Sequence, residues 1–143
     1  MPFDLERFVT AQQPVYATVC EELAAGRKAS HWMWFVFPQL RALGRSSTAK
    51  FFGIEGLDEA VAYWAHPVLR ERLRHCTQLV LGVQGRSIHQ IFGSPDDLKL
   101  CSCMTLFEVA APDEPGFGLL LQQGFGGERD SATLALLPSQ TEG

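Results

Sequence analysis

The chain has 143 residues, of which 46% are hydrophobic and 20% are charged. This composition excludes intrinsic disorder, and the length suits one domain with a substantial core. The longest apolar run, residues 32–37, is too short to cross a membrane, and the first residues lack the basic and apolar regions of a signal peptide. We therefore expect a cytoplasmic protein with no membrane association. A formal net charge of −4 argues against nucleic acid as a partner.

The first thirty residues predict a pair of amphipathic helices. Asp4 is the expected N-cap of the first helix, and Pro14 fits the first turn of the second. Gly26 is a natural stop for that second helix. Its buried stripe is expected at the i, i+3, i+4 and i+7 positions Tyr16, Val19, Cys20 and Leu23.

Residues 30–40 are harder to assign, because almost every position is apolar. The segment could be a buried strand, or a short helix that Ser30 caps and that ends before Pro38. We predict the helix, because the chain has no second strand-like segment to pair with and a lone strand would leave its backbone groups unpaired.

The middle of the chain predicts three helices. Ser46 and Ser47 can cap a short helix that Gly53 closes, and a second helix is expected over residues 57–65. The buried face of this second helix is expected to carry Leu57, Val61 and Trp64.

The third of these helices begins at Pro67, ends at Gly82 and has the clearest amphipathic pattern in the chain. Its apolar stripe should be buried in one piece, and it consists of Leu69, Leu73, Cys76 and Val80.

The last third of the chain predicts further helices. A short one over residues 87–92 ends at Gly93, and Ser94 then caps a longer helix that Pro95 begins and that runs toward Phe107. The Ser94 hydroxyl should accept a hydrogen bond from the Asp97 amide. Beyond it we expect a loop over 113–118, a helix over 119–123, a glycine-rich turn over 124–127 and a helix over 130–137.

The predicted fold is therefore all-α, with residues 1–143 forming a single compact multihelical domain. Its ordered core should span about residues 4–137, and residues 138–143 should form a polar tail. The four cysteines are expected to be reduced and mostly buried. No C-x-x-C or H-x-x-x-H spacing occurs, so we expect no metal site and no cofactor.

Two segments carry candidate functional residues. Residues 30–45 combine a histidine, tryptophans, an amide and arginines, which suit a pocket for a planar or phosphorylated ligand. Residues 94–99 place two carboxylates and a lysine at a helix start, where capping and surface charge explain them adequately; paired carboxylates could also do acid–base work if they lie in a cleft. The predicted ligand-binding residues are Trp32, Trp34, Gln39, Arg45, Asp96 and Lys99.

We expect the two segments to line one cleft. His31 would be the acid–base group, because its ordinary pKa lies near neutrality, and Asp97 would orient it or activate a water. Arg45 or Lys99 would hold a phosphate or carboxylate. The alternative is that both tryptophans fill the core.

Four strings occur in order along the chain, SHWMWFVFPQLRALGRS, AYWAHPVLRERLR, IFGSPDDLKLCSCMTLF and FGGERDSATLALL. Together they resemble the family called domain of unknown function 1810, from about Leu5 to Leu137. The resemblance implies a small, mostly α-helical bacterial cytosolic protein and carries no established activity or catalytic residues. Cys101 and Cys103 depart from the smaller or polar residues expected there, which argues against a role for these thiols.

Members of this family are sometimes labelled calpastatin, after the calpain inhibitor. Such inhibitors are similar to disordered chains, whereas this chain is 46% apolar and has repeated amphipathic faces. The label therefore does not describe its function.

Three functional hypotheses follow. The first is a binding protein for a small anionic or nucleotide-like molecule, with hydrolysis as one reaction that its site could carry out. The second is a non-enzymatic interaction module, in which the tryptophans are buried and the arginine face meets an acidic protein or nucleic acid. The third is an enzyme similar to N-glycosidases that act on ADP-ribose-type substrates. Neither the substrate nor the oligomeric state follows from the sequence.

Overall fold

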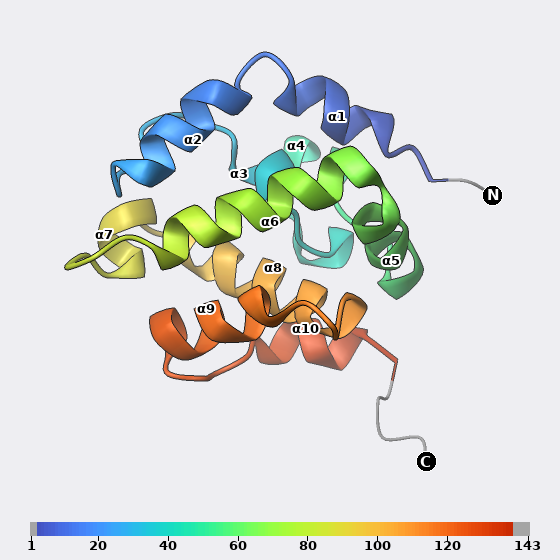
Figure 1. Cartoon of the computed structure of the whole chain (residues 1–143). Coiled ribbons are helices and arrows are strands. Elements are labelled where there is room, and N and C mark those ends of the chain that lie inside the picture. The colour runs from blue at the N-terminus through green and yellow to red at the C-terminus, as the bar shows by residue number, and fades with distance from the viewer. Residues whose placement is uncertain (1–2, 139–143) are drawn as a thin grey trace.

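The structure is a computed structural model that describes residues 3–138, and these residues form ten α-helices and one short 3-10 helix, η1 (Figure 1). The prediction of an all-α fold is confirmed. Most of the predicted polar tail, residues 139–143, lies outside the described residues. In chain order the elements are α1 Glu6–Gln12, α2 Tyr16–Ala24, α3 Met33–Val36, η1 Arg41–Leu43, α4 Ser47–Phe51, α5 Leu57–Ala65, α6 Pro67–Leu81, α7 Ile88–Phe92, α8 Asp96–Ala110, α9 Pro115–Phe125 and α10 Ser131–Leu136.

Helix α8 lies at the centre of the core. Every side chain from Leu100 to Phe107 is buried, as expected of a helix with packed neighbours on all sides. Helices α5, α7, α9 and α10 contact α8 directly. Helix α6 packs between α2 and α9, and Figure 1 shows α1 and α2 covering the side of α6 that faces away from α9.

The apolar stripe of α6 is confirmed. Leu69, Leu73, Cys76 and Val80 are all at most 1% exposed, so the periodicity identifies the buried face of this helix. The pattern did not show that α8 is the most central helix, however, because its middle, residues 100–107, is buried on every side and has no exposed polar face to make a stripe visible.

The N-terminal ends of three helices differ from the predictions. Leu5, not Asp4, precedes α1, without a side-chain cap, and Pro14 lies in the turn before α2. The helical prediction for residues 30–40 is correct, but α3 begins only at Met33 and Ser30 does not cap it. The Ser30 hydroxyl instead donates to Glu22, since a carboxylate is the stronger acceptor.

Ser94 does not cap α8, which corrects the predicted hydrogen bond to the Asp97 amide. Pro95 occupies the N-cap position, and the Asp97 amide donates to the Gly93 carbonyl at 2.8 Å. The backbone therefore supplies the acceptor that the serine was expected to supply. The cap predicted from Ser46 for α4 is present, and Asp130, predicted as the first residue of the last helix, instead caps α10.

Helix α5 has the predicted bounds but buries a different face. Its buried residues are Glu59, Ala60 and Tyr63, whereas Val61 is 47% exposed. The prediction followed the apolar residues and so missed a buried carboxylate. The partner that makes this burial tolerable comes from α1, far away in the sequence.

Helix α9 is longer than predicted. It begins at Pro115, where the Glu114 side chain accepts a hydrogen bond from the Gly116 amide, and it continues to Phe125. The glycines in this segment made it look like loop and turn. Tertiary packing against α6 and α8 overrides their low helix propensity.

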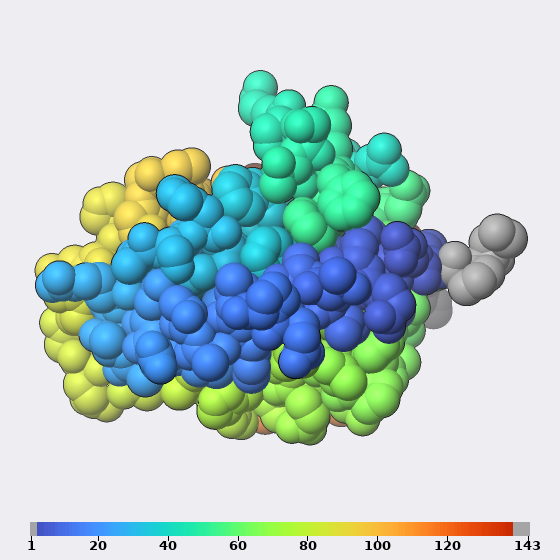
Figure 2. Space-filling model, turned by 90° about the horizontal axis from the view of Figure 1, so that it is seen from above, coloured from blue at the N-terminus to red at the C-terminus, as the bar shows by residue number. Residues whose placement is uncertain are grey.

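The segment that carries η1 and α4 projects from the edge of the face that α1 and α2 cover, as Figure 2 shows. A parallel β-bridge between Leu40 and Ile54 closes its base. The Arg41 amide donates to the Ile54 carbonyl at 2.8 Å, and the Ile54 amide donates to the Gln39 carbonyl at 2.9 Å. None of the helices in the described part of the chain is long and apolar enough to cross a membrane.

Gly53, which follows α4, is required because the chain there passes close to Arg41 at the start of η1. A Cβ at Gly53 would lie 2.4 Å from the Arg41 Cα, a backbone atom that cannot rotate away. We expect Gly53→Ala to lower the free energy of unfolding by about 1–3 kcal/mol, measured by urea denaturation. Gly56→Ala is the matched control, because a Cβ there meets nothing within 4 Å, and it should change stability by no more than about 0.5 kcal/mol. Equal effects of the two substitutions would contradict the close approach.

Candidate functional site

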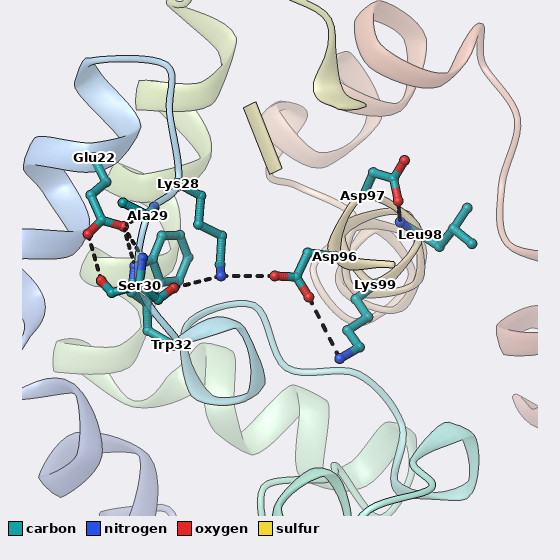
Figure 3. A network of polar contacts seen from close by, with 9 residues as sticks. All are labelled: Glu22, Lys28, Ala29, Ser30, Trp32, Asp96, Asp97, Leu98 and Lys99. Carbon is teal, nitrogen blue, oxygen red and sulfur yellow. Dashed lines mark hydrogen bonds and ion pairs between the residues drawn. The ribbon is translucent and has the colours of Figure 1, made fainter. Parts of the chain in front are cut away.

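Glu22 organises the loop between α2 and α3. Its carboxylate accepts hydrogen bonds from the Ala29 and Ser30 amides, the Ser30 hydroxyl and the Trp32 Nε1, at 2.6–3.1 Å (Figure 3). Burial raises the pKa of this carboxyl, but the four hydrogen bonds together outweigh burial and lower the pKa to about 2. The sequence prediction did not single out Glu22, because its partners become visible only when the loop folds back onto α2.

Trp32 was predicted to bind ligand, and its position corrects this prediction. The side chain is 1% exposed, and its Nε1 donates to Glu22 at 2.8 Å. A buried ring whose polar atom is already bonded has no surface or hydrogen bond left for a ligand. Trp32 therefore belongs to the core, which is the alternative that the sequence left open for it.

A chain of charges connects this loop to α8. Lys28 Nζ lies 2.9 Å from the Asp96 Oδ2, 2.7 Å from the Ser30 carbonyl oxygen and 4.9 Å from the centre of the Trp32 ring. Asp96 Oδ1 also lies 3.7 Å from Lys99 Nζ (Figure 3). Two ammonium groups thus share one carboxylate, and one positive charge is left over. Asp96 therefore already has two cationic partners.

Lys99 lies beside Trp34, another predicted ligand-binding residue. Its Nζ is 5.4 Å from the centre of the Trp34 ring, within the range of a cation–π interaction. Trp34 is only half-buried, in contrast to Trp32, so part of its surface stays accessible.

His31 and Asp97 have separate surroundings. His31 is exposed in the loop before α3. Asp97 Oδ2 lies 3.0 Å from the Nδ1 of His89, and its Oδ1 accepts the Leu98 amide at 2.8 Å. In Figure 3 Asp97 lies on a different side of α8 from Asp96 and Lys99. The carboxylate expected to orient His31 is therefore committed to another histidine.

Three predicted residues do share a cavity. Gln39, Arg45 and Lys99 line a space of about 540 Å³ between the η1–α4 segment on one side and the starts of α8 and α10 on the other. Neither His31 nor Asp97 lines it. The remaining lining residues are Leu43, Gly44, Ser46, Ala49, Pro95, Leu98, Ser102, Asp130 and Ala132.

The polar groups that line this cavity differ in whether they already have hydrogen-bond or ion-pair partners. Arg45 is exposed and forms no ion pair within residues 3–138. Asp130 Oδ2 accepts the amide and the hydroxyl of Thr133 and so caps α10. Ser102 donates to the Leu98 carbonyl at 3.3 Å. Arg45 and Lys99 are therefore the charged groups most available to a ligand.

The sequence prediction did not include Ser102 and Asp130, which also line the cavity. Asp130 was predicted only as the first residue of the last helix, and Ser102 only lay within the helix predicted to run toward Phe107. No periodicity or short motif connects residues near 45, 99 and 130, because they meet only when α8 and α10 pack together.

The Glu22 network predicts a pH dependence. Because the pKa of Glu22 falls from 4.5 to about 2 on folding, its contribution to stability is complete above pH 4.5 and is lost as the pH falls toward 2. We expect Glu22→Gln to lower the free energy of unfolding by about 1–3 kcal/mol at pH 7. The difference from the wild type should shrink between about pH 5 and 2, measured by urea denaturation across this range. Glu21→Gln, an exposed neighbour on α2, is the control and should show neither effect. A pH-independent cost of Glu22→Gln would contradict the ionised network.

Comparisons with known proteins support the fold and name no activity. The family model described as protein of unknown function (DUF1810) matches residues 2–137. The chain is similar to the conserved hypothetical protein Rv1873 from Mycobacterium tuberculosis, with a TM-score of 0.94 to its crystal structure and 60% identity. The similarity covers 96% of this chain and 98% of that one. No curated protein matches.

Proposed function

We propose that this chain, which belongs to the DUF1810 family of proteins of unknown function, binds a small anionic molecule in the cavity between η1–α4 and α8. The observation that carries the proposal is that Arg45 and Lys99, from segments far apart in the sequence, line the same space of about 540 Å³. This volume is in the usual range for small-molecule sites.

Charge favours an anion in this cavity. Two cationic side chains, Arg45 and Lys99, line the cavity with one carboxylate, Asp130, in a protein whose formal net charge is −4. An anion in the cavity would be attracted by both Arg45 and Lys99, and the one carboxylate in the lining, Asp130, already accepts the amide and hydroxyl of Thr133. Arginine in addition presents a fork of donors that matches phosphate or carboxylate oxygens.

The rest of the lining favours a ligand with an apolar or planar body. Leu43, Ala49 and Leu98 form an apolar wall, while Gln39 and Ser46 add polar groups. Nucleotides and sugar phosphates combine an anionic group with such a body. These are the ligand classes that we expect to bind.

The binding proposal assigns no reaction. His31 and Asp97 stay predictions as an acid–base pair, and the proposal uses neither, because they do not line the cavity and Asp97 is paired with His89. The experiment below also tests the interaction-module and N-glycosidase hypotheses.

Thermal unfolding in the presence of AMP, ADP-ribose, glucose 6-phosphate and inorganic phosphate tests the proposal, with adenosine as the uncharged probe. A ligand at about 100 times its Kd stabilises the folded state by about 2.7 kcal/mol. We expect at least one phosphorylated probe to raise Tm and adenosine not to do so. Hydrolysis of a bound probe, detected by chromatography of the mixture, would add an activity to the binding.

Matched variants locate the site. Arg45→Gln and Lys99→Gln should each weaken binding of the active probe about tenfold, because each removes a charge-assisted contact. Arg27→Gln removes an exposed arginine that does not line the cavity, and it should bind as the wild type does. Equal loss in all three variants would point to nonspecific attraction, and no Tm shift with any probe would favour the interaction module.

A further inference from the structure

The ammonium group of Lys28 is nearly buried and depends on α8 for its counter-charge. The side chain is only 7% exposed, and its Nζ lies 2.9 Å from the Asp96 Oδ2, within hydrogen-bond distance. The Ser30 carbonyl oxygen and the face of the Trp32 ring lie against the same ammonium group. Because water has little access to this charge, the loss of its carboxylate partner would be costly. Asp96 is therefore committed first to Lys28.

Lys99 contacts the same carboxylate more weakly. Its Nζ lies 3.7 Å from the Asp96 Oδ1, which is beyond hydrogen-bond distance, and its side chain is 26% exposed. Figure 3 shows the two lysines approaching Asp96 from different sides. Lys99 lines the cavity of about 540 Å³, whereas neither Lys28 nor Asp96 does. One carboxylate between two ammonium groups leaves one positive charge unmatched, and these distances leave it on Lys99.

We propose that Lys28 is a positioning residue for the anion site. By neutralising Asp96, it prevents that carboxylate from pairing closely with Lys99, and the Lys99 ammonium group stays available to an anionic ligand. This inference rests on the proposed function, because Lys99 is the group through which Lys28 acts on the ligand. It adds to that function a residue from the loop between α2 and α3, outside the lining of the cavity.

Lys28 thereby couples the loop between α2 and α3 to the cavity. The loop is fixed at this residue, because the Lys28 amide donates to the Ile91 carbonyl at 2.8 Å, and Glu22 accepts two amides of the residues that follow. Lys28 reaches Asp96 only while the loop holds this position. Docking of the loop and binding of an anion at Lys99 should therefore favour each other, and such coupling is reciprocal.

The three charges give opposite expectations for two single variants. Lys28→Gln leaves Lys99 as the nearest cation to Asp96, so anion affinity should fall roughly two- to fivefold, the effect of one partly exposed ion pair. Asp96→Asn removes the competing carboxylate, so anion affinity should rise by a similar factor. The double variant Lys28→Gln/Asp96→Asn leaves Lys99 without either neighbour's charge and should bind as the wild type does.

Isothermal titration calorimetry at pH 7 and low salt measures these affinities. The probe is whichever of AMP, ADP-ribose, glucose 6-phosphate and inorganic phosphate binds the wild type most tightly. Arg27→Gln and Asp113→Asn are the matched controls, because they make the same changes of charge at exposed positions that do not line the cavity, and both should bind as the wild type does.

The signs of the effects separate an electrostatic role from a structural one. If Lys28 only held the loop in place, both single variants and the double variant would weaken binding, and that result would overturn the inference. Asp96→Asn leaves the Lys28 charge buried without a partner, whereas the double variant leaves no such charge. The comparison of Lys28→Gln with the double variant therefore decides the matter even where Asp96→Asn folds poorly. A double variant that binds as weakly as Lys28→Gln would contradict the proposal.

Labelling of lysine amines separates this inference from the proposed function. The chain has three lysines, so acetic anhydride treatment followed by peptide mapping gives a labelling rate for each. Lys28→Gln should lower the rate at Lys99 roughly two- to fivefold relative to the exposed Lys50, because Asp96 then holds Lys99 as an unreactive ammonium ion. The double variant should restore that rate. Absence of probe binding by the wild type would refute the proposed function, whereas an unchanged Lys99 rate in Lys28→Gln would overturn this inference with or without a ligand.

Discussion

Replacing Glu59 by glutamine should lower the free energy of unfolding by about 3–5 kcal/mol. Glu59 is 1% exposed and its Oε2 lies 3.0 Å from Arg7 Nη1, whose side chain is only 11% exposed. The substitution keeps the size of the side chain and removes its charge, so the Arg7 guanidinium stays buried without a counter-charge. The cost is that of an uncompensated buried ion, not of a surface pair.

The position of Arg7 enlarges this effect. Its guanidinium also donates to the carbonyl oxygens of Asp4, Phe51 and Gly53, at 2.8 Å to Phe51 and 2.9 Å to Gly53. The ion pair therefore joins α1 to the end of α4 and to α5. Loss of the counter-charge should loosen all three elements together.

The matched control is Glu55→Gln. Glu55 pairs with Arg41 at 2.9 Å, but both side chains are more than half exposed, so water solvates either charge when the other is removed. We expect a change of about 0–1 kcal/mol. Urea denaturation of both variants at pH 7 makes the comparison. Similar small effects at both positions would show that the Arg7–Glu59 pair is solvated.

Truncating Leu73 to alanine should lower the free energy of unfolding by about 2–5 kcal/mol. Leu73 is 1% exposed and lies at the middle of the α6 stripe, between α2 and α9. Shortening it removes buried apolar surface and leaves a cavity that rigid neighbouring helices cannot fill.

Val68→Ala on the same helix is the control for helix propensity and for general disturbance of α6. Val68 is 38% exposed, so its truncation should change stability by no more than about 0.5 kcal/mol. Chemical denaturation with an unchanged m-value would assign the Leu73 effect to the native state. A Leu73 variant that unfolds like the Val68 variant would mean that α6 presents a different face to the core.

The helices were predictable where their signals are local. The α6 stripe, the Ser46 cap and the ends of α5 depend on residues within a few positions of one another, and the structure contains all three. Ser94 shows the limit of such signals. A serine before a proline and two acids has the pattern of a cap, yet the Gly93 carbonyl accepts the Asp97 amide instead.

The candidate site was predictable in part. Gln39, Arg45 and Lys99 were selected for their chemistry, and they line one cavity. Trp32 was selected on the same ground but is buried, and Asp97 is paired with His89. Residue chemistry is thus visible in the sequence, whereas the partner of each group depends on how the helices pack.

The sequence by itself determined that the chain is helical, where most helices lie and which face of α6 is buried, because capping and periodicity act within one or two turns. Only the tertiary structure decided which charges lie inside and what they bind. Arg7 meets Glu59 and Lys28 meets Asp96 across long stretches of chain. A carboxylate tolerates burial only when such a distant cation or a set of amides reaches it, and no local pattern records that condition.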